Sequence, residues 1–254
     1  MSYITTKNQY ITVSNNKIAY RELSKGKSDL PLVMLVHLAA TLDNWDPKLL
    51  DLLAEQHHVI VLDLPGVGAS HGKVAPTIPG MAEQAVSIIK ALGHEKINLL
   101  GLSMGGFEVD KVTGKTFRYM LKAGLERVDP KRYIFYNHDE AGRLEAEKVL
   151  GRMGQRSAAH ADKDMNVPGF LTQLKAIKRW GRELQDDMAF ITQPTLIVNG
   201  DKDMQVPTEN SYTMHEKIKN SQLIIYPNAG HGSNFQNAEE FSKALLAFLE
   251  ESNA

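Results

Sequence analysis

Three residue types that together perform acyl transfer stand far apart in this sequence, and each follows a short apolar run. Ser103 lies in GLSMGG (101–106), directly after such a run. His231 stands between two glycines in NAGHGSNF, and the carboxylates Asp201 and Asp203 follow TLIVNG. A serine hydroxyl becomes a nucleophile when a histidine takes its proton, and an acid then fixes the histidine tautomer. The order Ser, Asp, His therefore predicts a nucleophilic serine site, with either aspartate as the acid.

The glycines beside Ser103 have a physical role. At a tight turn between a strand and a helix, the backbone of neighbouring segments passes so close that side chains beside the serine would clash with it. Glycine is therefore favoured on both sides of Ser103, where the chain has Gly101 and Gly105. Such a turn exposes the serine hydroxyl and directs the next amide, that of Met104, toward a developing oxyanion. The alternative is a glycine-rich turn in which Ser103 only caps a helix. The ordered histidine and aspartate partners favour the catalytic interpretation.

Composition excludes several classes of protein. The 254 residues suit one domain or a core domain with a lid. The chain has 29 basic and 30 acidic residues, and the basic ones are not gathered in a stripe, so nucleic acid is not an expected partner. The chain has no cysteine, which excludes disulfides, thiolate metal sites and a cysteine nucleophile. The first residues lack the features of a signal peptide, and the apolar runs are too short to span a bilayer. We expect a soluble, cytoplasmic protein that binds a small molecule and no membrane.

Short aliphatic runs alternate with helical patterns along most of the chain, which indicates a mostly parallel α/β sheet with helices on both faces. The expected strands are 9–13, 17–23, 32–37, 58–64, 97–102, 195–200 and 223–227, and the expected helices are 45–55, 80–92, 208–219 and 237–250. The charged block 111–190 interrupts this alternation and predicts an inserted helical lid. The core is then formed by residues 1–110 and 191–254. Within the block, only RYIFYN (132–137) has strand character.

With these motifs in this order, the chain resembles the α/β-hydrolase superfamily, especially its small bacterial esterases and cofactor-free haloperoxidase-like members. The matching pieces are LVHLAATLDNWDP, DLPGVGAS, GLSMGG, GDKDMQVP and AGHG. The resemblance implies Ser103 as the nucleophile and His231 as the base. In the family's Gly-x-x-Asp-x-x-Val-Pro pattern the acid is the second carboxylate, which implies Asp203.

The resemblance also implies an oxyanion hole made by two backbone amides. One belongs to Met104, and the other falls on Leu38 or Ala39, of which we prefer Ala39. Leu38 stands where the family usually has glycine, which adds a side chain near the acyl pocket. His37 is expected to be structural.

In the family a long helix and a sixth core strand follow the serine turn and would take about 25–30 residues. Here the chain passes from Gly106 almost directly into lid-like sequence. Three outcomes are open. Residues 132–137 could fill the empty slot as a replacement core strand, the flanking strands could pair directly, or the motifs could remain without the geometry. In the first case the preceding replacement helix would carry an apolar stripe of Phe117, Leu121, Leu125 and Val128.

The resemblance implies a serine hydrolase that cleaves a small uncharged ester or lactone through an acyl-enzyme, with no cofactor. One alternative is a cofactor-free haloperoxidase or perhydrolase on the same triad, and another is a catalytically disabled binding protein. A metal site is not expected, because the adjacent His57 and His58 would point to opposite faces of a strand. A sheet edge left open by the missing strand could also drive the formation of a homodimer.

Overall fold

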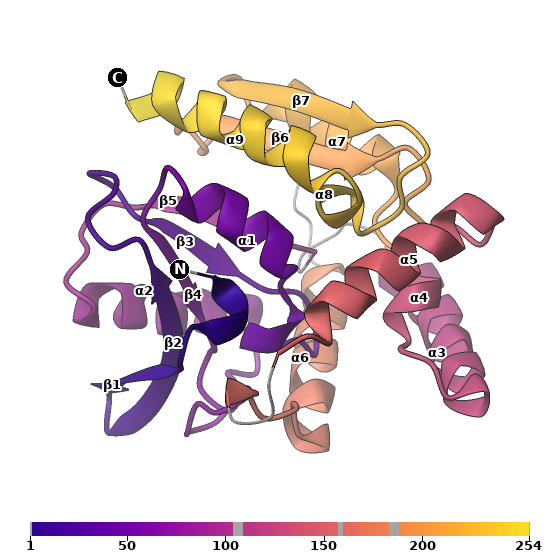
Figure 1. The fold of residues 1–254 in the computed structure, drawn as a ribbon, viewed down its shortest axis with the longest axis horizontal. Helices are drawn as coiled ribbons and strands as arrows, with labels where there is room; N and C mark the ends of the chain where they lie inside the picture. The colour runs from indigo at the N-terminus through magenta and orange to yellow at the C-terminus, as the bar shows by residue number, and fades with distance from the viewer. Residues whose placement is uncertain (1, 104–108, 157–159, 183–187, 254) are drawn as a thin grey trace. The chain divides into compact units, whose positions relative to one another are not determined.

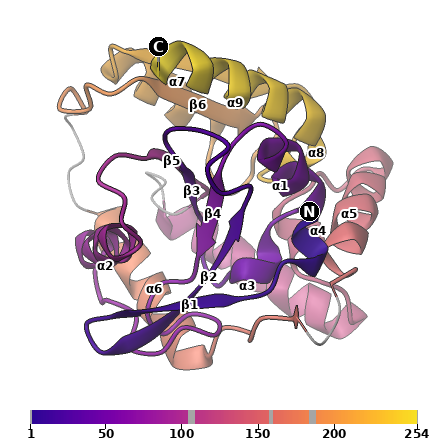
Figure 2. The same cartoon turned by 60° about the vertical axis from the view of Figure 1, so that its left-hand side comes forward.

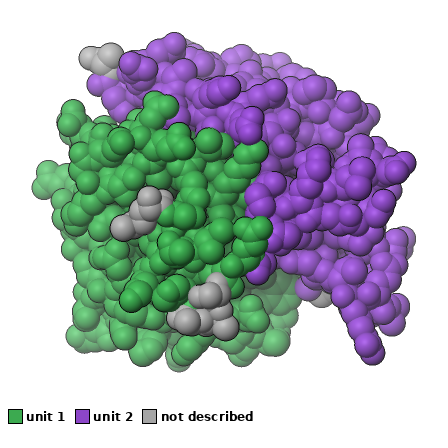
Figure 3. Space-filling view, in the orientation of Figure 1, with its two compact units in different colours: residues 1–105, 155–180 green, residues 106–154, 181–254 purple. Residues whose placement is uncertain are grey.

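The computed structural model describes residues 2–103, 109–156, 160–182 and 188–253. The chain divides into a first unit, Met1–Gly105 with Gln155–Trp180, and a second unit, Gly106–Gly154 with Gly181–Ala254 (Figure 3). In chain order the elements, labelled in Figure 1, are η1 (Tyr3–Thr5), β1 (Gln9–Val13), β2 (Asn16–Leu23), β3 (Leu32–Leu35), η2 (Leu42–Asn44), α1 (Pro47–Ala54), β4 (Val59–Leu62), α2 (Ile78–Ala91), β5 (Asn98–Gly101), α3 (Val109–Glu126), α4 (Lys131–Ile134), α5 (Glu140–Met153), α6 (Val167–Trp180), β6 (Thr195–Gly200), α7 (Thr208–Lys217), β7 (Ser221–Tyr226), α8 (Ser233–Gln236) and α9 (Ala238–Asn253).

The first unit is built on a five-stranded sheet in the order β1-β2-β4-β3-β5. β1 and β2 form an antiparallel hairpin whose turn residues, Ser14 and Asn15, have φ angles of 48° and 64°. Two consecutive left-handed residues make the turn type whose twist matches that of the flanking strands. β2 also runs antiparallel to β4, whereas β3 lies parallel between β4 and β5. The carboxyl ends of β3 and β5 therefore meet at one edge of the sheet.

Helices α1 and α2 lie on opposite sides of this sheet (Figure 2). Both begin at a side-chain cap, since Asp46 and Thr77 accept hydrogen bonds from backbone N–H groups of the first turn. Ile88 of α2 packs into an apolar core with Val33 and Ile60 of the central strands, and all three are fully buried. Burial of this kind stabilises the fold by about 1.5–3 kcal/mol for each large aliphatic side chain.

The second unit is built on the parallel strands β6 and β7, which pair in register along their whole lengths. Helix α7 packs against both strands. Helix α9 buries Phe241, Leu245 and Leu249, whose spacing places them on one face. Each strand and helix expected outside residues 111–190 is present in the structure. The predicted α/β fold class, in which helices alternate with strands, is therefore confirmed.

The prediction of a replacement core strand at 132–137 is wrong, because Lys131–Ile134 form helix α4. The chain starts this helix at Asp129 and Pro130. The Asp129 carboxylate accepts from the N–H of Lys131 at 2.8 Å, and a proline fits a first helical turn because it needs no N–H partner there. Within the described residues β5 pairs with β3 and β6 with β7, and direct pairing of the strands that flank the missing one stays a prediction.

The block expected as a lid is helical but differs from the prediction in its packing. Helix α3 follows the serine turn, yet Leu121 and Leu125 of its expected apolar stripe are 68% and 79% exposed. The block is also shared between the units, because Gln155–Trp180 group with the first and the residues before them with the second. Across the described parts of the chain, no helix has the length and apolar character needed to cross a membrane.

Candidate active site

Ser103 leaves the sheet at the end of β5 in a conformation that most residues avoid. β5 is in register with β3, Gly101 opposite Leu35, and the N–H of Leu102 donates to the Leu35 carbonyl at 3.1 Å. The next residue, Ser103, has a φ of 74°, in the left-handed region that costs a non-glycine residue about 1–2 kcal/mol. Strain of this kind concentrates at functional sites. The expected oxyanion donor Met104 lies outside the described residues.

The turn after β3 reaches the same edge of the sheet as Ser103. The N–H of Ala40 donates to the carbonyl of His37 at 3.2 Å, and Ala39 between them has a φ of 62°. His37 is buried, with Nδ1 2.9 Å from the carbonyl oxygen of Leu38. A carbonyl only accepts, so the proton of this pair sits on Nδ1. The contact ties His37 to its own turn, as expected of a structural residue.

The amide of Ala39, the preferred second oxyanion donor, is engaged by a residue that sequence reasoning missed. Its N–H donates to Oε1 of Gln173 at 3.0 Å. Gln173 lies on α6 and is 3% exposed, on the buried face that also holds Gly169 and Ala176. A polar side chain on the buried face of a helix requires a hydrogen-bond partner. That mismatch of side chain and position is the signal that could have identified Gln173.

In the second unit, His231 and Asp203 form a hydrogen-bonded pair. His231 Nδ1 lies 2.8 Å from Asp203 Oδ2, and the two side chains are 5% and 2% exposed. Because a carboxylate only accepts, Nδ1 carries the proton, and Nε2 of the neutral ring is the acceptor. This is the tautomer that can take a proton from a serine hydroxyl.

The loop after β6 fixes Asp203 rather than Asp201 in this pair. The other carboxylate oxygen of Asp203 accepts from the N–H groups of Gln205 and Val206, at 2.7 and 2.9 Å. These bonds hold the carboxylate in place. Asp201 is exposed, and its N–H donates to the carbonyl of Tyr226.

Gly200 allows this loop to pack against the strand that carries it. A Cβ at this position would lie 2.1 Å from the carbonyl oxygen of Ala229, which no real contact tolerates. The same carbonyl accepts from the N–H of Lys202 at 2.9 Å. The loop that bears the acid and the loop that precedes His231 are therefore joined by direct backbone contact.

Phe135, at the end of α4, packs on the loop that carries His231. The two rings lie 4.9 Å apart, edge to face, and the Phe135 carbonyl accepts from the N–H of Gly232 at 2.9 Å. A Cβ on Gly230 would lie 2.6 Å from the same carbonyl oxygen, so glycine is required for the approach. Sequence reasoning missed Phe135, because the composition of its segment predicts a strand.

The expected site residues thus fall into two groups. Ser103 and Ala39 lie at the ends of neighbouring strands in the first unit, and His231 and Asp203 form a buried pair in the second. Within the described ranges, no cluster of three or more His, Cys, Asp or Glu side chains is arranged to hold a metal ion. His58 instead contacts Glu22, with Nε2 2.8 Å from the carboxylate.

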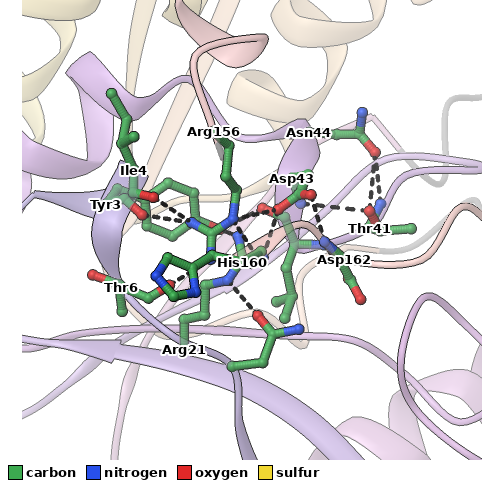
Figure 4. A network of polar contacts seen from close by, with 12 residues as sticks. Tyr3, Ile4, Thr6, Arg21, Thr41, Asp43, Asn44, Arg156, His160 and Asp162 are labelled. Carbon is green, nitrogen blue, oxygen red and sulfur yellow. Dashed lines mark hydrogen bonds and ion pairs between the residues drawn. The ribbon is translucent and has the colours of Figure 1, made fainter. Parts of the chain in front are cut away.

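A buried network of charges ties the segment before α6 to the start of the chain (Figure 4). Asp43 pairs with Nη2 of Arg21 at 2.5 Å and with Nε of Arg156 at 3.1 Å. Arg156 also donates to the carbonyl of Tyr3 at 2.6 Å, and the N–H of Asp162 donates to Asp43 at 2.6 Å. One carboxylate therefore compensates two guanidinium groups that are almost fully buried, at 0% and 5% exposure.

The loop after β4 carries a buried carboxylate, Asp63. Asp63 is fully buried, and a Cβ on Gly68, whose φ is 54°, would lie 2.1 Å from its Oδ2. Burial and the neighbouring Asp162 carboxylate raise the pKa of Asp63 well above its ordinary value. This close packing indicates a structural role for the loop.

Comparison with known proteins places this arrangement in a family. The alpha/beta hydrolase fold family matches residues 31–110, and the TAP-like protein family matches residues 176–254. A solved alpha/beta hydrolase fold protein from Chitinophaga pinensis superposes with a TM-score of 0.89 at 28% identity, covering 98% of this chain and 99% of that one. The chain belongs to the α/β-hydrolase superfamily.

Two curated relatives match nearly end to end. A non-heme haloperoxidase of Rhodococcus erythropolis is 27% identical, with 95% of this chain and 99% of the relative covered. The (E)-2-((N-methylformamido)methylene)succinate hydrolase of Acinetobacter baylyi is also 27% identical, with 94% and 97% covered. The first alignment runs over 285 positions, more than the 254 residues of this chain, so the relative carries residues that this chain lacks.

Proposed function

We propose that the protein is a serine hydrolase that cleaves a small uncharged ester or lactone with Ser103, His231 and Asp203. The observation that carries the proposal is the buried His231–Asp203 pair, in the tautomer that a general base needs. The left-handed conformation of Ser103 at a strand end supports its role as nucleophile.

In the proposed reaction, Nε2 of His231 takes the proton of the Ser103 hydroxyl while Oγ bonds to the ester carbonyl carbon. The negative charge passes to the carbonyl oxygen, where the amides of Ala39 and Met104 would stabilise it. The intermediate collapses, the alcohol leaves with the proton from His231, and an acyl-enzyme remains. Water then attacks with His231 as the base, which releases the acid and restores Ser103. Asp203 stabilises the imidazolium in both steps.

A second proposal is peroxide-dependent chemistry on the same residues, favoured because the chain is similar to a non-heme haloperoxidase. Acetic acid would acylate Ser103 with loss of water, and hydrogen peroxide would take the place of water in the second step. The product would be peracetic acid. Formation of peracid from acetate and peroxide, compared with hydrolysis of an acetate ester, measures the ratio of the two reactions.

Labelling by a fluorophosphonate, followed by intact mass, tests the shared nucleophile. We expect one phosphonyl adduct on the wild-type protein and none on Ser103→Ala. Ser14→Ala is the matched control, since Ser14 is also a turn serine with a positive φ, and it should label fully. A folded wild-type protein that takes up no probe would refute both catalytic proposals and favour a disabled binding protein.

A further inference from the structure

The contact between Ala39 and Gln173 is unusual for a backbone amide proposed to bind an oxyanion. The amide N–H can only donate, so the atom 3.0 Å away must be the Gln173 side-chain oxygen and not its nitrogen. This oxygen belongs to a neutral carboxamide. Its carbonyl is the same kind of acceptor as the carbonyl of an ester.

The position of this contact is fixed from both sides. Ala39 is held in its left-handed conformation by the turn that follows β3. On the other side, the N–H of Gly169 donates to the Asn166 side chain at 2.8 Å and caps the start of α6. A Cβ on Gly169 would lie 3.3 Å from the carbonyl oxygen of Gly66, so α6 packs closely against the loop that follows β4. The segment before α6 is anchored further by Arg156. Release of Ala39 therefore requires rotation of the Gln173 side chain rather than movement of the helix.

We propose that the Gln173 side-chain oxygen accepts the hydrogen bond of the Ala39 amide in the resting enzyme, in the place that the substrate oxyanion would take. Gln173 then selects for substrates whose reacting oxygen can displace it. The proposal rests on the hydrolase function and on Ala39 as a donor. A neutral ester carbonyl that replaces Gln173 exchanges one carbonyl acceptor for another and gains little. An oxyanion is a stronger acceptor, because a hydrogen bond to a charged oxygen is roughly twice as strong as a neutral one. The exchange therefore favours the transition state over the bound substrate.

The consequence is measurable in the free enzyme. The Ala39–Gln173 hydrogen bond stabilises the resting state, and every productive encounter has to break it. Removing the acceptor should raise kcat/KM by roughly 2- to 12-fold, the factor that corresponds to the net worth of one neutral hydrogen bond. A side chain that only supported the turn would have the opposite effect, because its loss would disorder the donor and slow the reaction.

Three substitutions at one position separate these cases. Gln173→Leu and Gln173→Met keep most of the volume and remove the acceptor, and thermal unfolding shows which of them folds as the wild type does. Gln173→Glu places a carboxylate against the N–H of Ala39. The carboxylate should accept a stronger hydrogen bond from this N–H than the carboxamide does, and its charge should repel the developing oxyanion. Lys175→Met is the matched control, because Lys175 is exposed on the same helix. The rate of fluorophosphonate labelling is measured for each, since the phosphoryl oxygen takes the oxyanion position.

We expect labelling 2- to 12-fold faster in Gln173→Leu or Gln173→Met than in the wild type, and at least tenfold slower in Gln173→Glu at neutral pH. Protonation of His231 slows labelling of every variant at low pH, so the expected sign of the carboxylate is a ratio of Gln173→Glu to wild-type rate that rises as the pH falls. Hydrogen exchange of the Ala39 amide should accelerate in the Leu and Met variants. Labelling that is unchanged or slower in folded Leu and Met variants would overturn the role of Gln173 while leaving the hydrolase proposal intact. No labelling of any variant would refute the hydrolase proposal and this one with it.

Discussion

Replacement of Asp203 by asparagine is the sharpest test of the proposed base. Asp203 accepts three hydrogen bonds, one from His231 and two from the N–H groups of Gln205 and Val206. Asparagine has one oxygen, which can keep the two backbone bonds, and its NH2 group would then face His231. A donor at that point forces the imidazole to accept at Nδ1 and to carry its proton on Nε2. In that tautomer the ring cannot take a proton from Ser103.

We expect Asp203→Asn to lower kcat for an acetate ester by roughly 10⁴-fold, the general size of effect when a triad aspartate is replaced by asparagine. The fold should change little, because the side chains are nearly the same size. Asp201→Asn is the matched control two residues away, on an exposed side chain, and should keep activity within about twofold. The reasoning is refuted if Asp203→Asn retains a third or more of the activity, or if the Asp201 variant loses as much.

Two further predictions concern stability. Gly200→Ala should lower the free energy of unfolding in urea by about 1–3 kcal/mol, because the added Cβ meets the Ala229 carbonyl. Gly151→Ala, in open space on α5, should instead raise it by up to about 1 kcal/mol. Equal urea midpoints for the two variants would contradict this reasoning. The raised pKa of Asp63 means that the folded state holds this proton more tightly than the unfolded state, so stability falls as pH rises above about 4 toward the folded pKa. Asp162→Asn removes the like charge and should raise the urea midpoint at pH 7 but not at pH 4; a gain of the same size at both would count against it.

The parts of the fold that the sequence predicted are those with a strong local pattern. Buried runs such as VIVL in β4 read as strands, and Phe241, Leu245 and Leu249 repeat at the spacing of a helix face. The pairing of His231 with Asp203 also agrees with the motif that follows β6. In these places local propensity and tertiary packing favour the same structure.

The sequence was misleading where aromatic residues outweighed a capping signal. RYIFYN has the composition of a strand, yet Asp129 and Pro130 before it begin a helix, and Phe135 packs on the loop of His231. Periodicity predicted the apolar stripe on α3, but Leu125 of this stripe is exposed, since periodicity defines a face without supplying a partner for it. The partner of Gln173 could not be predicted from the sequence, because it lies 134 residues away along the chain.

The division of the chain into two units has a consequence for the order of events during synthesis. Arg156 reaches back across 153 positions to Tyr3, and the first unit also needs Gln155–Trp180. The ribosome therefore has to make Gly106–Gly154, which belong to the second unit, before the first unit can close. Contacts of such long range slow folding and leave apolar surface exposed meanwhile. Neither half of the gene, expressed separately, encodes a complete unit.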